Sequence, residues 1–170
     1  MSKVLIRYPK PSDIQAMCDY INSLSQEQTF IRFQGEKISL EEETAYLNSQ
    51  LEKIKKKRAV LLLAFVGDEL VGVSGIDLRD KIESHEGIFG ISIAKDHRGQ
   101  GIGKMLMQET LTAATKELTD LKIITLGVFA NNNLALKMYQ QFGFKEYGRL
   151  PGGVKYKNSY VDHVFMYREV

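Results

Sequence analysis

The sequence contains few of the residues that stabilise disulfide-bonded or metal-bound folds. Its 170 residues include one cysteine, Cys18, three prolines and no tryptophan. A single cysteine can form neither an intramolecular disulfide nor a cysteine-rich metal site. The three histidines show no metal-ligand spacing, so we expect no bound metal. We therefore expect a fold held together by its hydrophobic core, in a reducing, cytoplasmic location.

Long hydrophobic runs and a strong net charge are also absent. No apolar run approaches the ~20 residues needed to span a bilayer, and the first residues form no secretory signal. Lysine and arginine number 23 against 21 acidic residues, a net charge of +2. The basic run 53–58 ends a predicted helix that begins with the acidic run 41–43, which complements the helix dipole. We expect no membrane or nucleic-acid partner. Nucleic-acid binding stays a weaker alternative, which salt-dependent retention on DNA would reveal.

The chain does contain a regular succession of helix and strand patterns. Apolar residues at helical spacing predict helices within 14–24, 39–54, 101–117 and 132–141. Alternating or continuous apolar residues predict strands at 3–8, 59–66, 70–78, 87–94, 122–129, 144–148 and 160–168. No repeat or linker divides the sequence. We therefore predict a single mixed α/β domain over residues 1–170.

A glycine-rich loop is the most informative stretch of the sequence. Residues 91–104 read Ile-Ser-Ile-Ala-Lys-Asp-His-Arg-Gly-Gln-Gly-Ile-Gly-Lys, a predicted strand that runs through a basic turn into a predicted helix. Glycines allow a ligand to approach the main chain closely. The following helix adds unpaired N–H groups and the positive end of its dipole. The loop therefore predicts a site for an anion the size of a diphosphate.

Two well-known phosphate-binding loops do not fit this stretch. A Walker A loop requires glycine where Arg98 stands and serine or threonine where Met105 stands. A dinucleotide fingerprint that starts at Gly101 requires a small residue at position 106, which is leucine. A glycine-rich turn without a ligand stays open as an alternative. Three alternating glycines behind an arginine nevertheless exceed what a turn requires.

The pattern that does fit is Arg/Gln-x-x-Gly-x-Gly/Ala, at Arg98, Gly101 and Gly103. In this respect the sequence resembles the GNAT superfamily of N-acetyltransferases, in which the loop holds the pyrophosphate of acetyl-CoA. The segment from Asn132 to Phe144, Asn-x-x-Ala-x-x-x-Tyr-x-x-x-Gly-Phe, resembles the second cofactor-contacting segment of the family. The resemblance implies a mixed, splayed, mostly antiparallel sheet of about seven strands flanked by about four helices.

The resemblance also implies acetyl-CoA as the acetyl donor. The main chain around Ile93 is expected to pair with the pantetheine arm as an extra strand would, where two strands splay apart. Asn132 is expected to bind the arm or order the loop, and Tyr139 to lie near the sulfur. The expected cofactor-binding residues are Ile91, Ile93, Ala94, Arg98, Gly99, Gln100, Gly101, Ile102, Gly103, Lys104, Asn132 and Tyr139.

Acetyl transfer to an amine sets three chemical requirements: a neutral amine, stabilisation of the developing oxyanion and a proton for the departing thiolate. A lysine-like amine with a pKa of about 10.4 is neutral in only about one molecule in 2,500 at pH 7. Such an acceptor needs a general base more urgently than an α-amino group does. The backbone N–H of Ile93 is our candidate for the oxyanion.

Tyr139 is the candidate general acid. It lies two helical turns after Asn132, so both side chains are expected on one face of the helix. The alternative for Tyr139 is packing in the core. Glu86, at the start of the strand that leads to the loop, is the candidate base through a chain of waters. Glu83 and His85 are the alternatives for that role.

The acceptor is expected to be small. The segment 160–166 alternates like a strand, and residues 151–153, Pro-Gly-Gly, are expected to be flexible before it. This arrangement is similar to that of GNAT enzymes that act on amino acids and small amines. Asp162 is a candidate for binding the acceptor ammonium, with a structural hydrogen bond as the alternative. Arg32 and Phe33, in the polar loop 25–38, are expected to form the opposite wall.

We therefore predict an enzyme that transfers an acetyl group from acetyl-CoA to a primary amine of a small molecule or amino acid, by direct attack in a ternary complex. One alternative is acetylation of a protein N-terminus or lysine. Another is a non-catalytic acyl-CoA-binding regulatory module. Acceptor-dependent release of the thiol would separate these alternatives. Related enzymes often dimerise, so a homodimer is a further expectation.

Overall fold

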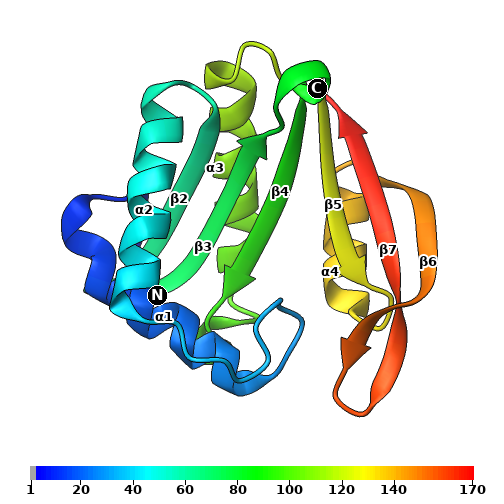
Figure 1. The fold of residues 1–170 in the computed structure, drawn as a ribbon, viewed down its shortest axis with the longest axis horizontal. Coiled ribbons are helices and arrows are strands. Elements are labelled where there is room, and N and C mark those ends of the chain that lie inside the picture. The colour runs from blue at the N-terminus through cyan, green and yellow to red at the C-terminus, as the bar shows by residue number, and fades with distance from the viewer. Residues whose placement is uncertain (1–2) are drawn as a thin grey trace. The chain divides into compact units, whose positions relative to one another are not determined.

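Figure 1 shows the computed structural model, which describes residues 3–170. Within this range the chain forms seven strands and four α-helices. In chain order they are β1 (Val4–Arg7), α1 (Ile14–Glu27), α2 (Leu40–Lys55), β2 (Ala59–Val66), β3 (Glu69–Leu78), β4 (Glu86–Ile93), α3 (Ile102–Glu117), β5 (Ile123–Phe129), α4 (Asn133–Gln141), β6 (Lys145–Tyr156) and β7 (Ser159–Glu169). The hydrogen-bonded strand order is β1-β2-β3-β4-β5-β7-β6. Strands β4 and β5 pair in parallel, whereas β1–β2, β2–β3, β5–β7 and β6–β7 are antiparallel. The predicted fold class is confirmed.

The chain divides into two compact units. The first contains the chain up to Asp77 and Gly90–Thr119, and the second contains Leu78–Phe89 and Asp120–Val170. Strand β4 contributes to both units, its first half to the second unit and its second half to the first. A single domain over the whole chain stays a prediction.

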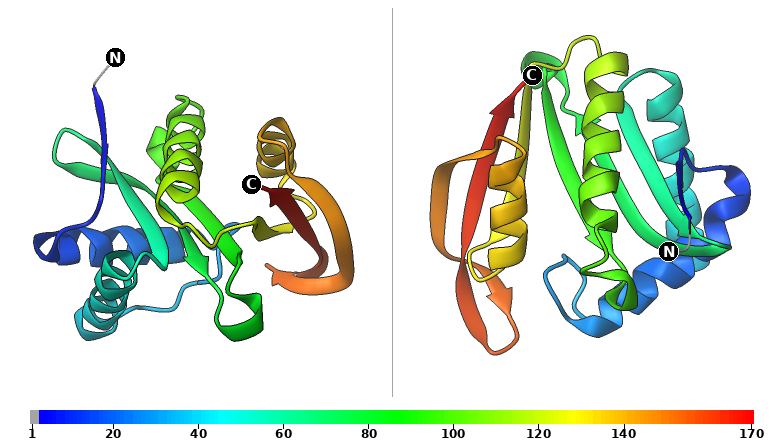
Figure 2. Two further views of the ribbon diagram at one scale, coloured as in Figure 1. Left: turned by 90° about the horizontal axis from the view of Figure 1, so that it is seen from above. Right: turned by 180° about the vertical axis from the view of Figure 1, so that it is seen from behind.

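The first unit is built around β2. Every residue of Ala59–Phe65 is buried, because helices lie on both faces of this strand. Figure 2 shows α1 and α2 on one side of the strands of this unit and α3 on the other. Leu24, Leu47 and Leu63 are almost fully buried in the cluster that α1 and α2 form with the sheet. The side chains of the continuous apolar run of β2 therefore pack into a hydrophobic layer on each face of the strand.

Helix α2 begins where the sequence predicts. Ser39 accepts a hydrogen bond from the backbone N–H of Glu42 at 3.1 Å, and the Glu42 carboxylate accepts one from the backbone N–H of Ser39 at 2.7 Å. These two bonds form the capping box that the spacing of the two residues indicates. Acidic residues occupy the first turn and Lys53 and Lys55 the last. The basic run is thus the end of an amphipathic helix.

The second unit has a helix on one face of its strands. Helix α4 covers the face on which Leu126 of β5 and Val164 and Met166 of β7 are buried. On the other face the strands of this unit, which the structure describes throughout, carry no helix of the same unit. In Figure 1, α4 lies behind β5 and β7 and leaves their front face uncovered.

The segment Pro-Gly-Gly at 151–153, which is expected to be flexible, lies within a strand. Strand β6 continues through these residues, and its register against β7 shifts between Leu150 and Val154. Gly152 has a φ of 61°, and its N–H donates to Asp162 Oδ1 at 3.1 Å. The structure thus accommodates the extra residues as a β-bulge inside a paired strand, and their flexibility stays a prediction.

The helices of residues 3–170 include none that is both long and apolar enough to cross a membrane.

Candidate functional site

The glycine-rich loop lies in the first unit, between β4 and α3. Gly99 and Gly101 have φ values of 75° and 82°, in the left-handed region that favours glycine. A Cβ placed on either glycine would meet nothing within 4 Å, so their main chain faces open space. The first N–H of α3 bonded to a loop carbonyl is that of Met105, to Gly101 O at 3.1 Å. The preceding N–H groups of Ile102, Gly103 and Lys104 therefore point beyond the helix start, as the N–H groups of an anion-binding helix terminus do.

Arg98 connects this loop to two other elements of the first unit. Its Nε donates to the carbonyl oxygen of Ile93 at 2.9 Å. Its Nη2 lies 2.7 Å from Oε2 of Glu27, the last residue of α1, whose side chain is only 16% exposed. The guanidinium group thus holds the loop against the end of β4 and the end of α1. Direct contact of Arg98 with a diphosphate stays a prediction.

The end of β4 is fixed by further contacts in the first unit. The Tyr20 hydroxyl and Ser92 Oγ lie 3.0 Å apart, and Ala94 N donates to Val71 O at 2.8 Å. Ile91 and Ile93 alternate with Ser92 along the strand, and Ile93 packs beside Gly72. Gln100 closes the loop by donating to Asp96 O at 2.9 Å. The main chain that leads into the loop is therefore held from both faces of β4.

Glu27 and Tyr20 are the supporting residues that the sequence analysis missed. A signal for Glu27 exists, because a carboxylate at a helix C-terminus opposes the helix dipole and requires a cationic partner. Arg98 is that partner. Tyr20 gives no such signal, since it occupies a regular position in the apolar stripe of α1.

Asn132 caps helix α4 of the second unit. Its Oδ1 accepts a hydrogen bond from Ala135 N at 3.2 Å, and its own N–H donates to Phe129 O at 2.9 Å. The cap fixes the point at which α4 leaves β5. Because the cap uses the side-chain oxygen, the amide nitrogen is the group left for a ligand.

Tyr139 lies on the inner face of α4 and is 8% exposed. Its ring packs edge-on against Phe89 and at a tilt against Phe144, each at 6.1 Å between ring centroids. Burial raises the pKa of Tyr139 to about 12. The phenol is therefore protonated at neutral pH, which is the form that a general acid requires. The same surroundings also suit a packing role.

Glu86 lies in the second unit with two partners of its own. Its Oε1 accepts a hydrogen bond from Thr125 Oγ1 at 2.6 Å and lies 3.0 Å from Arg79 Nε. Burial tends to raise the pKa of Glu86, but the bonds from Thr125 and Arg79 outweigh it and hold the pKa below its usual value. Such a carboxylate is a weak proton acceptor. His85, an alternative base, uses its backbone oxygen to accept from Lys122 N at 2.8 Å.

The candidate acceptor residues lie in different units. Arg32 is exposed and Phe33 half-buried in the loop after α1 of the first unit. Ser25 orders that loop by donating to Glu36 O at 2.6 Å. Asp162, in the second unit, accepts from Gly152 N and lies 3.5 Å from Arg149 Nη1. Asp162 thus makes the structural hydrogen bond that stood as its alternative role.

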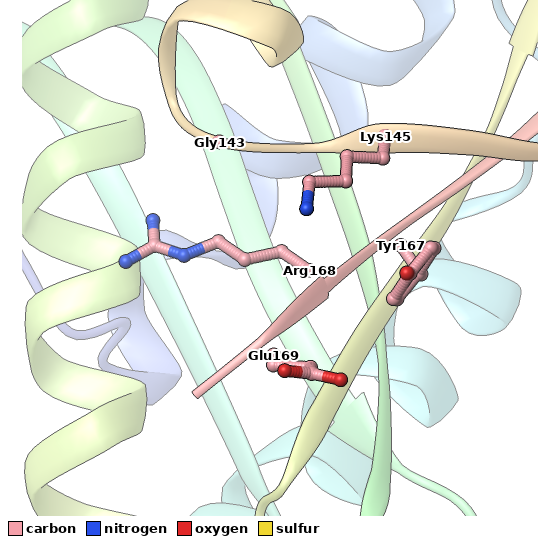
Figure 3. Close-up of a pocket in the computed structure, with 5 residues that line it drawn as sticks. All are labelled: Gly143, Lys145, Tyr167, Arg168 and Glu169. Carbon is pink, nitrogen blue, oxygen red and sulfur yellow. The ribbon is translucent and has the colours of Figure 1, made fainter.

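A pocket of about 290 Å³ in the second unit contains none of the predicted site residues. Its lining residues are Gly143, Lys145, Tyr167, Arg168 and Glu169. Figure 3 shows Lys145 on β6 and Arg168 on β7, with Arg168 extending away from Tyr167. Arg168 Nη1 donates to Phe142 O at 3.0 Å, which joins β7 to the end of α4. The basic side chain therefore has a structural partner.

Comparisons with known proteins agree with the family that the loop pattern indicates. The model of the acetyltransferase (GNAT) family matches residues 20–144. The L-amino acid N-acetyltransferase of Escherichia coli is 32% identical over 111 residues, which are 63% of this chain and 66% of that protein. A GNAT-family acetyltransferase from Streptococcus pneumoniae has a TM-score of 0.90 at 26% identity, over 99% of each chain. A ribosomal-protein-alanine N-acetyltransferase from Brucella melitensis has a TM-score of 0.82 at 23% identity, over 98% of this chain and 99% of that one, a likeness of fold alone.

Proposed function

The chain belongs to the acetyltransferase (GNAT) family, and on this premise we propose that it acetylates a primary amine of a small molecule or free amino acid. Acetyl-CoA is the acetyl donor. The observation that carries the proposal is the open main chain of Gly99 and Gly101 in front of the first turn of α3. A hydrogen bond to a charged group contributes about 1.5–3 kcal/mol. Several N–H groups that converge on a diphosphate therefore provide substantial binding energy.

The proposed reaction is a direct attack in a ternary complex. When bound, acetyl-CoA supplies an acetyl group activated as a thioester. The amine nitrogen forms a bond to the carbonyl carbon, the carbon–sulfur bond breaks, and the nitrogen loses one proton. The backbone N–H of Ile93 donates to the carbonyl oxygen as negative charge develops there. Tyr139 donates its phenolic proton to the departing thiolate. The predicted role of Glu86 as the base stays a proposal, made less favourable by the ion pair with Arg79.

A small acceptor is supported by the name of the Escherichia coli relative, which is an L-amino acid N-acetyltransferase. In the proposal, exposed Arg32 binds the acceptor carboxylate beside Phe33. Binding of the acceptor ammonium by Asp162 stays part of the proposal, although this carboxylate already has two partners. A cytoplasmic location, a homodimer and the absence of nucleic-acid and membrane partners also stay predictions.

A protein N-terminus or lysine is the second candidate acceptor. It is favoured by the fold shared with the ribosomal-protein-alanine N-acetyltransferase. The two candidates differ in the length of chain that follows the reacting amine. Free amino acids and short peptides, compared as acceptors in one assay, therefore distinguish them by their kcat/KM values.

The first experiment measures binding of coenzyme A by calorimetry and acceptor-dependent release of its thiol with a panel of amines. The variant Gly101→Asp places a carboxylate where the loop faces the diphosphate, and we expect a loss of affinity of at least about 100-fold. Gly67→Asp is the matched control, because Gly67 also has a positive φ and open space around it. Equal affinity in Gly101→Asp and wild-type protein would remove the proposed site. Tight binding without thiol release would favour the non-catalytic acyl-CoA-binding module.

A further inference from the structure

The proposed reaction requires a group that removes a proton from the acceptor, and Glu86 is poorly suited to it. Its carboxylate is already bonded to Thr125 and paired with Arg79, within the part of β5 that pairs with β4. That ladder joins Glu86–Ile123, Gly87–Ile124 and Ile88–Thr125. A better base would lie beyond the last pair, on a face of the strands that a substrate can reach.

His163 on β7 lies beyond the last pair, on a face of the strands that no helix of the second unit covers. It pairs with Phe129 of β5, four residues beyond Thr125. Because side chains alternate across a sheet, His163 lies on the face opposite buried Val164 and α4. This is the face of β5 and β7 that carries no helix of the unit (Figure 1). Phe129, the partner of His163, lies six residues along β5 from Ile123, the partner of Glu86. Six residues of a strand span about 20 Å.

The imidazole of His163 is held in a close-fitting position. A Cβ added to Gly127 would lie 2.3 Å from Nε2 and 3.0 Å from Cε1 of His163, so the Nε2 edge of the ring rests against this glycine. The ring also packs at 4.3 Å from Phe165, between centroids. Glycine in the interior of a strand weakens it and often marks a close approach. Here the approaching group is a histidine ring, which the glycine allows to rest on the strand.

No charged side chain faces this ring from the neighbouring strands. Gly127 and Phe129 face it from β5, and Leu150 and Gly153 from β6. Farther along this face lie the phenols of Tyr147, Tyr156 and Tyr167, and Lys145 and Glu169, which pair with Tyr167 and Ile123. At the far end lies the ion pair of Glu86 and Arg79. Asp162 and Arg149 lie on the opposite face and pair with each other.

Burial lowers the pKa of His163 from its usual value. A neutral imidazole is therefore the main form at neutral pH. Neutral imidazole can accept a proton, whereas a base that is already protonated cannot.

We propose that the imidazole of His163 is the general base that removes the proton from the acceptor ammonium. This inference rests on the proposed acetyl transfer. The nitrogen–hydrogen bond of the ammonium breaks, the proton goes to the imidazole, and the freed lone pair forms the new bond to the acetyl carbon. The nitrogen then loses a second proton, which balances the proton that Tyr139 gives to the thiolate. The imidazolium then releases its proton to water. Phe165 and Gly127 keep the ring in the orientation from which it accepts the proton.

The pH dependence of kcat/KM with an alkylamine acceptor tests this role. In the wild-type protein, kcat/KM should rise with pH through the pKa of His163, below 6.5, and then stay level. In His163→Gln, only the free neutral amine reacts. Its kcat/KM should be lower by about 10²–10⁴-fold at pH 7 and should rise tenfold per pH unit toward the amine pKa near 10. Recovery at alkaline pH is a signature that a merely structural role would not produce.

Two controls complete the test. His97→Gln removes a histidine of the first unit and should keep the level region of the profile. Gly127→Ala should displace the ring and lower kcat/KM, whereas Gly148→Ala should not, because a Cβ there lies 3.9 Å from Phe165. A level profile retained in His163→Gln would overturn the proposal.

The role of His163 can also be tested without turnover. If no amine produces thiol release, the proposed acetyl transfer fails. The His163 ring can then be followed by NMR during titration with amines. A His163 signal that no amine shifts would overturn the inference, and a shifted signal would support an amine site there.

Discussion

The loop at residues 98–104 and the uncovered face of β5 and β7 present two different kinds of site. In the proposal, the loop acts through its main chain, whose glycines face open space in front of the first turn of α3. The uncovered face carries side chains brought together from separate strands, such as His163 against Gly127 and Glu86 beside Thr125, and in the proposal His163 acts through its side chain.

This difference decides what each region tolerates. A main-chain site depends on backbone conformation, so a side chain added in front of the glycines damages it more than most exchanges of neighbouring side chains. A side-chain site depends on the pKa and orientation of a few groups, which respond to each partner. Substitutions in the loop should therefore change cofactor affinity, and those in the second unit should change rate and pH dependence.

The largest effect outside the loop and His163 is expected from Tyr139→Phe. Removal of the phenolic proton should lower kcat by about 10²-fold or more, since general acid catalysis contributes about 10²–10⁴-fold. Affinity for coenzyme A, measured by calorimetry, should stay within about twofold because the ring contacts with Phe89 and Phe144 remain. An unchanged kcat would show that Tyr139 only packs in the core. It would also weaken the contrast between the loop and the uncovered face.

A smaller effect is expected from the ion pair that supports the loop. Glu27→Gln leaves Arg98 without its charged partner, so the loop should be held less firmly and affinity for coenzyme A should fall by about tenfold, or 1.4 kcal/mol. Because Glu27 has no contact with the ligand in the proposal, kcat at saturation should change little. Gln26→Glu is a control that adds an exposed charge one residue away.

A double-mutant cycle with Arg98→Gln measures the coupling between the two side chains. If the loss of affinity in the double variant equals the sum of the losses in Glu27→Gln and Arg98→Gln, the two side chains act independently. Arg98 would then act by direct contact with the diphosphate and not by positioning the loop.

The sequence predicts the parts of this protein that depend on local pattern. The capping box of Ser39 and Glu42, the continuous apolar run of β2 and the glycine conformations of the loop all follow from neighbouring residues. Contacts between residues far apart in the chain are not encoded locally. The pairing of Arg98 with Glu27, 71 positions away by their numbers, and of Glu86 with Thr125 could therefore be known only from the fold. The same reason conceals His163, whose partner Gly127 lies on another strand.

A third effect, on stability, follows from the lowered pKa of Glu86. A carboxyl whose folded pKa lies below its unfolded value of about 4.3 stabilises the fold above that value. This contribution is lost as the pH falls through the folded pKa. Glu86→Gln should therefore lower the free energy of unfolding by about 1 kcal/mol at pH 7.

The difference between wild type and Glu86→Gln should disappear toward pH 3. Denaturant unfolding at several pH values measures it. The exposed Glu83→Gln is the matched control and should show no such trend. A difference that does not change with pH would mean that the Glu86 carboxylate, despite its two partners, does not stabilise the second unit through its charge.

The smallest effect is expected in the first unit, away from both sites. Ser74 is 1% exposed, and its hydroxyl is a buried group for which the described residues provide no partner. A buried hydroxyl without a hydrogen bond costs free energy, so Ser74→Ala should leave the free energy of unfolding unchanged or raise it by up to about 1 kcal/mol. Thr110→Val is the contrasting variant, because the buried Thr110 hydroxyl donates to Leu106 O at 2.8 Å. That variant should lose stability by about 1 kcal/mol. A loss of stability in Ser74→Ala as large as in Thr110→Val would show that the Ser74 hydroxyl has a hydrogen-bond partner in solution. The core beneath α3 would then depend on a polar side-chain contact, as the uncovered face of β5 and β7 does.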